Sequence, residues 1–222
     1  ERRGHGGLTT KPKYLVNHHT AGPRLGNAPS LDVVRNGRAG LLGPLSNALI
    51  ARDGTWYVIA AGKCYHAGKV RNENYANEFT LGWEIEATGV DGVTTDYPDV
   101  QMKSVRLGNA AVADYLGMTE RNILAHKEVC LPVGRKIDPN FSMPKLRTDV
   151  EMILDRWHAP VEPSRDRPEP LFELKRILRN TPFPQRKMRG TDVEKVALAL
   201  VRAGHKLPGS RSGSLRLASR AN

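Results

Sequence analysis

Hydrophobic and polar positions follow two different periods along the first 158 residues of this 222-residue chain. Short apolar runs bounded by Gly, Pro or Asp predict strands, and apolar positions that recur every three or four residues predict helices. The predicted strands cover residues 13–18, 79–87 and 121–126, and the predicted helices cover residues 31–38, 99–116 and 144–157. Ser30 is the expected N-cap of the first helix.

A hairpin is predicted over residues 46–60, because Asp53-Gly54 separates two apolar runs. Strands interleaved with helices indicate an α/β domain, with a mixed central β-sheet flanked by helices. This domain is expected to span residues 1–158.

The chain changes character after residue 158. Residues 159–170 contain four prolines and five charges and are typical of a linker. Helices are predicted at 171–179 and, with a capping box at its start, at 191–203. Residues 208–222 have the composition of a disordered segment. Residues 171–222 therefore form a small, helical, basic C-terminal region in this interpretation.

Charge is concentrated in the same region. The chain carries a net charge of +11, and residues 160–222, with 14 Lys/Arg and 6 Asp/Glu, account for +8. Such a balance indicates either a polyanionic partner, such as nucleic acid, anionic lipid or wall polymers, or a charge that serves only solubility. Basic residues are not interleaved with aromatic ones, and no nucleic-acid-binding motif is present, which argues against nucleic acid.

Other sequence features limit the location of the protein. No run of about 18 apolar residues is present, so no transmembrane segment is expected. The N-terminus does not resemble a secretory signal. Only two cysteines occur, Cys64 and Cys130, which excludes a disulfide scaffold, although a single bridge between them stays possible.

Candidate chemistry begins with the histidines. His18 and His126 each end a predicted strand, and Asp138 follows His126 by twelve residues. Two imidazoles and a carboxylate are a standard ligand set for catalytic zinc, with one position left for water. No HExxH or CxxC motif is present, so the residues alone leave a metal site and purely structural histidines both open.

Five segments occur in the order found in the zinc-dependent N-acetylmuramoyl-L-alanine amidases: LVNHHTAG, SNALIARDGTWYV, CYHAG, LGWEIEATG and ILAHKEVCLPVGRKIDP. The resemblance covers about residues 12–158. That family includes phage endolysins and bacterial recycling amidases, and shares its fold with peptidoglycan recognition proteins. The resemblance implies a Zn²⁺-dependent hydrolase that cleaves peptidoglycan between N-acetylmuramic acid and the L-alanine of the stem peptide.

The resemblance also implies roles for individual residues. His18, His126 and Asp138 match the zinc ligands, with Cys130 as the alternative third ligand. Glu84 matches the catalytic glutamate and Lys136 the basic residue beside the metal. Strand alternation puts Glu86 on the same face as Glu84, so it competes for the catalytic role, whereas His19 is expected on the opposite face.

Three further positions are predicted to bind substrate. His66 matches the histidine of a Trp-His-Ala-Gly run, in which Tyr65 replaces the tryptophan. Asn47 occupies the place where the family often has a histidine. Ser46 stands where some members carry a catalytic tyrosine, which favours the subgroup that relies on glutamate.

Two questions of function stay open at this point. A non-catalytic peptidoglycan-binding module of the same fold is the alternative, although such modules lose metal ligands that this chain retains. A phage endolysin, made in the host cytoplasm without a signal peptide and acting at the cell wall, is the expected origin, with a bacterial autolysin as the alternative. The C-terminal region weakly resembles a cell-wall-binding repeat, and its charge would attract anionic wall polymers.

Overall fold

The computed structural model describes residues 4–93 and 96–159, and they contain a five-stranded sheet in the order β5–β4–β6–β1–β7. The strands are β1 (Tyr14–His19), β4 (Ala48–Ile50), β5 (Trp56–Val58), β6 (Thr80–Ile85) and β7 (Ile123–Ala125). Strands β4, β6, β1 and β7 run parallel, and β5 pairs antiparallel with β4 at one edge. The mixed sheet and the hairpin around Asp53-Gly54 confirm the sequence predictions.

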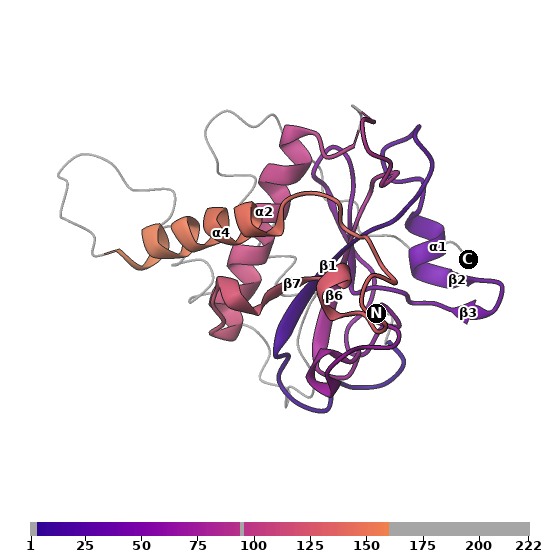
Figure 1. The fold of residues 1–222 in the computed structure, drawn as a ribbon, viewed down its shortest axis with the longest axis horizontal. Coiled ribbons are helices and arrows are strands. Elements are labelled where there is room, and N and C mark those ends of the chain that lie inside the picture. Colours follow the sequence, from indigo (N-terminus) through magenta and orange to yellow (C-terminus); the bar gives the residue numbers. More distant parts are fainter. Residues whose placement is uncertain (1–3, 94–95, 160–222) are drawn as a thin grey trace, which may run out of the picture.

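The two long helices cover one face of the sheet. Helices α2 (Asp99–Leu116) and α4 (Met143–His158) cross each other on that side (Figure 1), and they match the predicted helices to within one residue at each end. The main core forms between them and the sheet, with Leu15, Trp83 and Ile85 facing the helices. Every second residue of a strand supplies this face, because successive side chains point to opposite sides of the sheet.

A smaller cluster lies on the opposite face. Helix α1 (Leu31–Asn36) and the short hairpin of β2 (Gly37–Arg38) and β3 (Leu41–Leu42) lie away from α2 and α4 (Figure 1). Val34 of α1 packs there against Leu49 of β4 and the buried Cys64. This cover is less extensive than that of the helix face, and it leaves room for polar side chains.

Two local predictions need correction. The Ser30 side chain does not cap α1, because its hydroxyl donates to Glu86. His126 does not end a strand; it is the first residue of a short helix, α3 (His126–Val129), which the sequence did not predict because four residues hold barely one turn. Two 3₁₀ turns, η1 (Glu73–Tyr75) and η2 (Glu120–Asn122), were also missed.

The remaining predictions concern the two cysteines, membrane-spanning segments and the residues after 159. Cys64 and Cys130 are both buried and free, so no bridge joins them. Within the described ranges, no helix is both long and apolar enough to cross a membrane. The predicted linker from residue 160 onward, the predicted helices at 171–179 and 191–203, and the segment 208–222 lie outside the described residues.

Candidate metal centre and active site

The polar residues of the site lie at the carboxyl ends of the parallel strands. His18 of β1 is the register partner of Glu84 of β6, and Glu84 is in turn the partner of Leu49 of β4. Their side chains share the face opposite α2 and α4, and His126 follows the end of β7. The edge formed by the carboxyl ends of parallel strands is where open α/β sheets bind ligands.

Two histidines and one carboxylate converge there. Oδ2 of Asp138 lies 3.3 Å from Nδ1 of His18 and 3.0 Å from Nδ1 of His126. The three residues are buried, and one ligand atom from each lies within 4.8 Å of the others. This spacing suits a single metal ion, and nitrogen and carboxylate oxygen are ligands that transition metals accept.

The hydrogen-bond partners of the rings show that this set fits a cation. Nε2 of His126 lies 3.1 Å from the carbonyl oxygen of Ala67. A carbonyl only accepts, so in the neutral ring the hydrogen is on Nε2 and Nδ1 presents a lone pair to Asp138. Two lone pairs 3.0 Å apart repel unless a positive charge lies between them. Outer hydrogen bonds of this kind are typical of metal-binding histidines.

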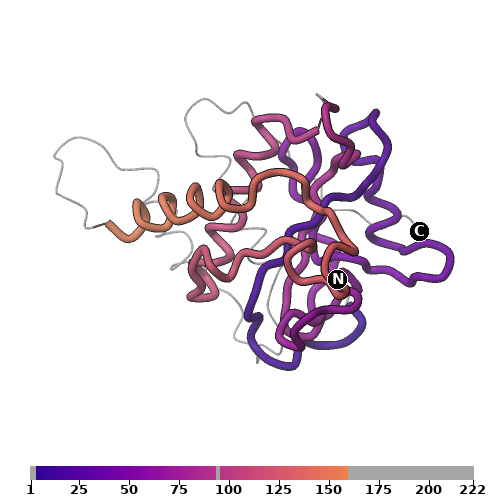
Figure 2. Tube along the Cα trace, viewed as in Figure 1, coloured from indigo at the N-terminus to yellow at the C-terminus, as the bar shows by residue number. Residues whose placement is uncertain are grey.

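Asp138 reaches the site through the segment that follows α3. Figure 2 follows the chain from β7 through residues 126–142 to α4. The backbone N–H of Lys127 donates to the carbonyl of Asp138 at 2.9 Å, which closes the loop on itself. Arg135 donates to the carbonyl groups of Leu131 and Lys69 and ties the loop to a neighbouring segment. These hydrogen bonds hold the loop, and with it Asp138, in place.

Cys130 does not take part in the cluster. Its thiol is directed to the carbonyl groups of Lys127 and Pro132, at 3.8 and 3.6 Å. The structure thus brings Asp138, rather than Cys130, together with the two histidines.

The electrostatics follow from burial and from the close contacts. Burial raises the pKa of Asp138, but its close contacts with the rings of His126 and His18 outweigh burial and hold that pKa below the usual value. Burial, helped by repulsion from His126 and opposed by Asp138, lowers the pKa of His18 to about 4. Neutral imidazoles beside an ionised carboxylate are the protonation states that bind metal.

Glu84 carries a buried carboxyl oxygen without a partner. Its Oε2 atom makes no hydrogen bond within the described part of the chain. Burial, with a contribution from the nearby negative charge of Asp138, raises the pKa of Glu84 to about 8. A carboxyl whose pKa lies close to the working pH can both take up and release a proton.

Glu86 differs from Glu84 in that both of its carboxylate oxygens have hydrogen-bond partners. It lies just beyond the end of β6 and is fully buried. Its carboxylate accepts hydrogen bonds from the hydroxyl of Thr20 and from the backbone N–H and hydroxyl of Ser30. Glu86 therefore holds the loop after β1 in place. Its carboxylate oxygens are occupied, whereas Oε2 of Glu84 has no partner, so Glu84 is the better candidate for the catalytic role.

Lys136 lies on the loop between α3 and Asp138, and it is partly buried. Its positive charge acts on both Glu84 and His18, where it lowers the pKa. This loop thus carries a cation close enough to act on Glu84 and on His18.

The three predicted substrate-binding residues have different surroundings. Tyr65 is 40% exposed and stacks on the ring of His5, so it is accessible. His66 is buried, with Nδ1 3.1 Å from Nε2 of His18. Asn47 is fully buried and donates to two backbone carbonyls while accepting from the N–H of Gly82. These bonds occupy the Asn47 amide inside the protein, so it has no group to offer a substrate.

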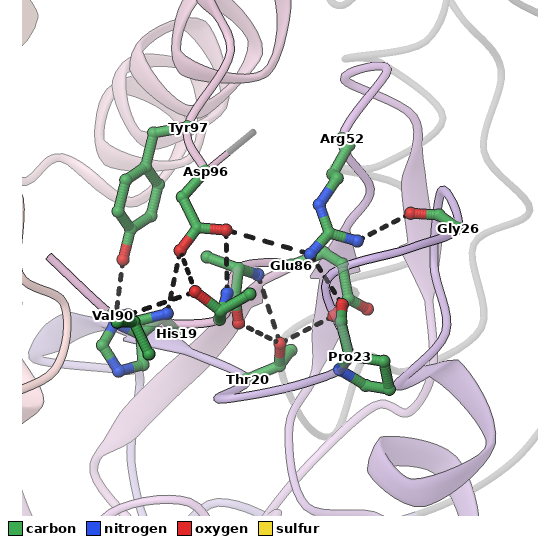
Figure 3. Close-up of polar contacts among 12 residues, drawn as sticks. His19, Thr20, Pro23, Gly26, Arg52, Glu86, Val90, Asp96 and Tyr97 are labelled. Atoms are coloured by element: carbon green, nitrogen blue, oxygen red, sulfur yellow. Dashed lines mark hydrogen bonds and ion pairs between the residues drawn. The ribbon is translucent and has the colours of Figure 1, made fainter. Parts of the chain in front are cut away.

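A polar network fixes the loops that border the site (Figure 3). Asp96 accepts from the hydroxyl and N–H of Thr88 and from the N–H of Gly89, and it forms an ion pair with Arg52 at 3.9 Å. Arg52 in turn donates to the carbonyls of Pro23 and Gly26. The loops after β1, β4 and β6 are thereby joined.

His19 belongs to the same network. Its Nδ1 lies 2.8 Å from the hydroxyl of Tyr97 (Figure 3), on the face of β1 opposite to His18. Strand alternation predicted this separation of the two neighbouring histidines.

Two residues beside the site escaped the sequence analysis. Thr80 contacts His66, and the Asn77 side chain accepts from the backbone N–H groups of His66 and Ala67. Thr80 could have been found, because it precedes Glu84 by four residues on the same strand and so shares its face. Asn77 lies in an irregular segment, where periodicity gives no signal.

Comparison with known families agrees with this geometry. A profile described as Amidase_2, N-acetylmuramoyl-L-alanine amidase, matches residues 8–141. The chain belongs to this family. Amidases of this kind hydrolyse the amide bond between N-acetylmuramic acid and L-alanine in peptidoglycan, and this is the reaction of the chain. The match includes all three residues of the candidate metal centre. No curated protein sequence matches the chain.

Solved amidase structures share the fold. The crystal structure of a selenomethionine derivative of AmpD is 21% identical and has a TM-score of 0.53, with 67% of this chain and 92% of that chain covered. A mutant endolysin from Bacillus subtilis is 18% identical with a TM-score of 0.50, with 65% and 88% covered. At these sequence identities, the structural similarity establishes that the chain shares the amidase fold.

Proposed function

We propose that this amidase is zinc-dependent and that His18, His126 and Asp138 hold the ion. Bound there, zinc would supply a Lewis acid that polarises the lactyl carbonyl and lowers the pKa of water. The observation that carries the proposal is the convergence of hydrogen-free ligand atoms next to a buried, unpartnered carboxyl oxygen. Such an arrangement is costly in a protein interior unless a cation and a water molecule complete it.

Glu84 is the general base in this proposal. Its Oε2 atom takes a proton from the attacking water as the water oxygen bonds to the carbonyl carbon. The same carboxyl then gives the proton to the nitrogen of L-alanine while the C–N bond breaks. The products are a lactyl carboxylate on the glycan and a stem peptide whose freed amine takes up the second proton of the water as an ammonium group, so the carboxyl of Glu84 returns to its starting state.

Lys136 has an electrostatic role in the proposal. Its ammonium group would stabilise the negative charge that develops on the carbonyl oxygen. The support for this role is that its charge already acts on Glu84 and His18. Tyr65, exposed next to the buried His66, is the remaining candidate for substrate contact.

We further propose that this protein is a phage endolysin, which is made in the host cytoplasm and acts at the cell wall. The support is the order of the sequence motifs together with the fold shared with an endolysin. The basic residues beyond 159 would attract anionic wall polymers, and such attraction weakens with salt. The non-catalytic alternative is disfavoured because the ligand set and Glu84 are all present.

The test measures products and metal on the same sample. The purified chain is incubated with peptidoglycan, new products are identified by mass spectrometry, and the metal content is determined. We expect stem peptides with a free L-alanine amine, about one zinc per chain, loss of cleavage on chelation and recovery with added zinc. Cleavage that survives complete removal of metal would contradict the zinc mechanism, and zinc without cleavage would favour the non-catalytic binding module.

A further inference from the structure

The rings of His18 and His66 contact each other through nitrogen atoms. Nε2 of His18 lies 3.1 Å from Nδ1 of His66, and the rings meet edge to face. A neutral imidazole has one donor and one acceptor nitrogen. One of these two atoms must therefore carry the shared hydrogen, and the neighbouring groups decide which.

Thr80 gives the direction of this bond. Its hydroxyl donates to the carbonyl of Ala76 at 3.0 Å, and a hydroxyl has only one hydrogen. The Thr80 oxygen, 3.1 Å from Nε2 of His66, can then only accept, so His66 carries its hydrogen on Nε2 and a lone pair on Nδ1. His18 must donate from Nε2, which leaves the lone pair of its Nδ1 facing Asp138.

The same short segment acts on the second histidine of the centre. The carbonyl of Ala67, the residue after His66, accepts from Nε2 of His126. The backbone N–H groups of His66 and Ala67 both donate to Oδ1 of Asn77, at 3.1 and 2.9 Å. Two consecutive residues, held by one side-chain amide, thus fix the hydrogen position of both histidine rings.

Gly82 makes this arrangement possible. A methyl group at position 82 would lie 2.6 Å from Cγ and 2.8 Å from Nδ1 of His66. Only a residue without a side chain lets the ring lie against β6 at this point. His66 is therefore seated between the strand and His18, with both nitrogens used inside the protein.

We infer that His66 is a positioning residue that holds His18 in the tautomer with Nδ1 free for the metal. The inference deepens the proposed function and rests on it for the identity of the ion. It replaces the expectation that His66 contacts substrate, because its ring is buried and both of its nitrogens already have partners. Outer hydrogen bonds to metal-binding histidines typically contribute 10–100-fold to metal affinity.

The first measurement needs no metal. In the ¹⁵N-labelled, metal-free chain at neutral pH, the imidazole nitrogen shifts of His18 should report hydrogen on Nε2. His66→Phe keeps a ring of similar size but removes both nitrogens. In this variant His18 should no longer be restricted to the tautomer with hydrogen on Nε2. If His18 carries its hydrogen on Nδ1 in the unaltered chain, the inference is wrong whatever the enzyme does.

The second measurement is zinc affinity by competition with a chromophoric chelator. His66→Phe should weaken zinc binding about 10–100-fold, and Thr80→Val, which keeps the side-chain shape, should weaken it by about tenfold. Thr148→Val, on the exposed side of α4, is the matched control and should change it less than about twofold. Thr80→Val also covers the case in which His66→Phe does not fold.

Kinetics at saturating zinc separate positioning from substrate contact. A positioning role predicts that added zinc restores most of kcat in Thr80→Val and His66→Phe, with KM for peptidoglycan fragments unchanged. Wild-type zinc affinity combined with a raised KM would instead assign His66 to substrate and overturn the inference. An unaltered chain that binds no zinc would contradict the proposed function, while the tautomer measurement still decides this inference.

Discussion

The two faces of the sheet are made from the same strands but depend on different properties of their side chains. Toward α2 and α4, β6 presents Trp83 and Ile85, which are buried in a large apolar core. Toward the other side, the same strand presents Gly82 and Glu84, which border the metal centre. The helix face depends on volume and shape, whereas the site face depends on the direction of hydrogen bonds and the position of lone pairs.

On each face of the sheet, one glycine lies against an aromatic ring, so the same substitution can be compared on the two faces. On the helix face, a methyl group at Gly108 would lie 2.0 Å from Cζ2 of Trp56. On the site face, Gly82 has the same relation to His66. Equivalent changes at the two glycines should therefore cost stability on one face and metal affinity on the other.

The largest effect is expected for Glu84→Gln on the site face. The amide keeps the shape but cannot take up a proton, so kcat should fall by roughly 10³-fold or more. Stability should be unchanged or higher, because the substitution removes a buried carboxyl with a raised pKa. Zinc content and thermal unfolding of the same sample provide the control. Full activity in this variant would remove Glu84 from the mechanism.

Gly108→Ala should have the next largest effect, on stability alone. The methyl group collides with the ring of Trp56, which is held by a hydrogen bond from its indole N–H to Ser104. The collision outweighs the gain of about 1 kcal/mol in helix propensity, and we expect a net loss of about 2 kcal/mol. Urea unfolding measures this loss. Zinc affinity of the folded variant should stay within about twofold of the unaltered chain.

Gly82→Ala should have a smaller effect, visible mainly in metal binding. The methyl group displaces the ring of His66 and with it the bond to His18. We expect zinc affinity to fall about tenfold, measured by chelator competition. If instead stability fell by as much as in Gly108→Ala and zinc affinity did not change, the two faces would not differ in the way described.

Arg147→Met tests the contact between α4, on the helix face, and α3, which begins at His126 of the metal centre. Arg147 of α4 forms a two-point ion pair with Glu128 of α3, at 2.9 and 3.1 Å, and also donates to the carbonyl of Ile123. The pair is partly exposed, so solvent screening reduces its contribution, and we expect a loss of about 1 kcal/mol at pH 7. Lys145→Ala, which removes an exposed ion pair with Asp149 on the same helix, is the control.

The pH dependence of that loss sharpens the test. Burial raises the pKa of Glu128, but hydrogen bonds from Arg147 and from the N–H of Ala125 outweigh it and hold the pKa below 4.5. A carboxyl with a depressed pKa stabilises the fold above its unfolded value, and this contribution disappears as the pH falls through the folded value. The difference between Arg147→Met and the unaltered chain should therefore narrow below pH 4.5. A difference that does not change with pH would exclude the ion pair as its cause.

The comparison also explains what the sequence could reveal. The helix face follows simple periods, so α2 and the strands around Leu15 and Trp83 were predicted closely. The three residues of the metal centre came from ordered motifs, and the structure brings them together. What failed depended on hydrogen-bond direction: Ser30 bonds Glu86 instead of capping α1, and Asn47 bonds the backbone instead of facing a substrate. The spacing of apolar residues in a sequence does not indicate the direction in which a hydrogen-bond donor points.

The register of β1 and β6 has one further consequence. His18 and Glu84 are opposite residues of paired parallel strands, so their separation is set by the backbone ladder rather than by any loop. The loops after β1, β4 and β6 are joined to one another by Arg52, Asp96 and Glu86. For protein engineering, a loop that is exchanged alone would lose its contacts with the other two, so the three loops have to be replaced as one unit.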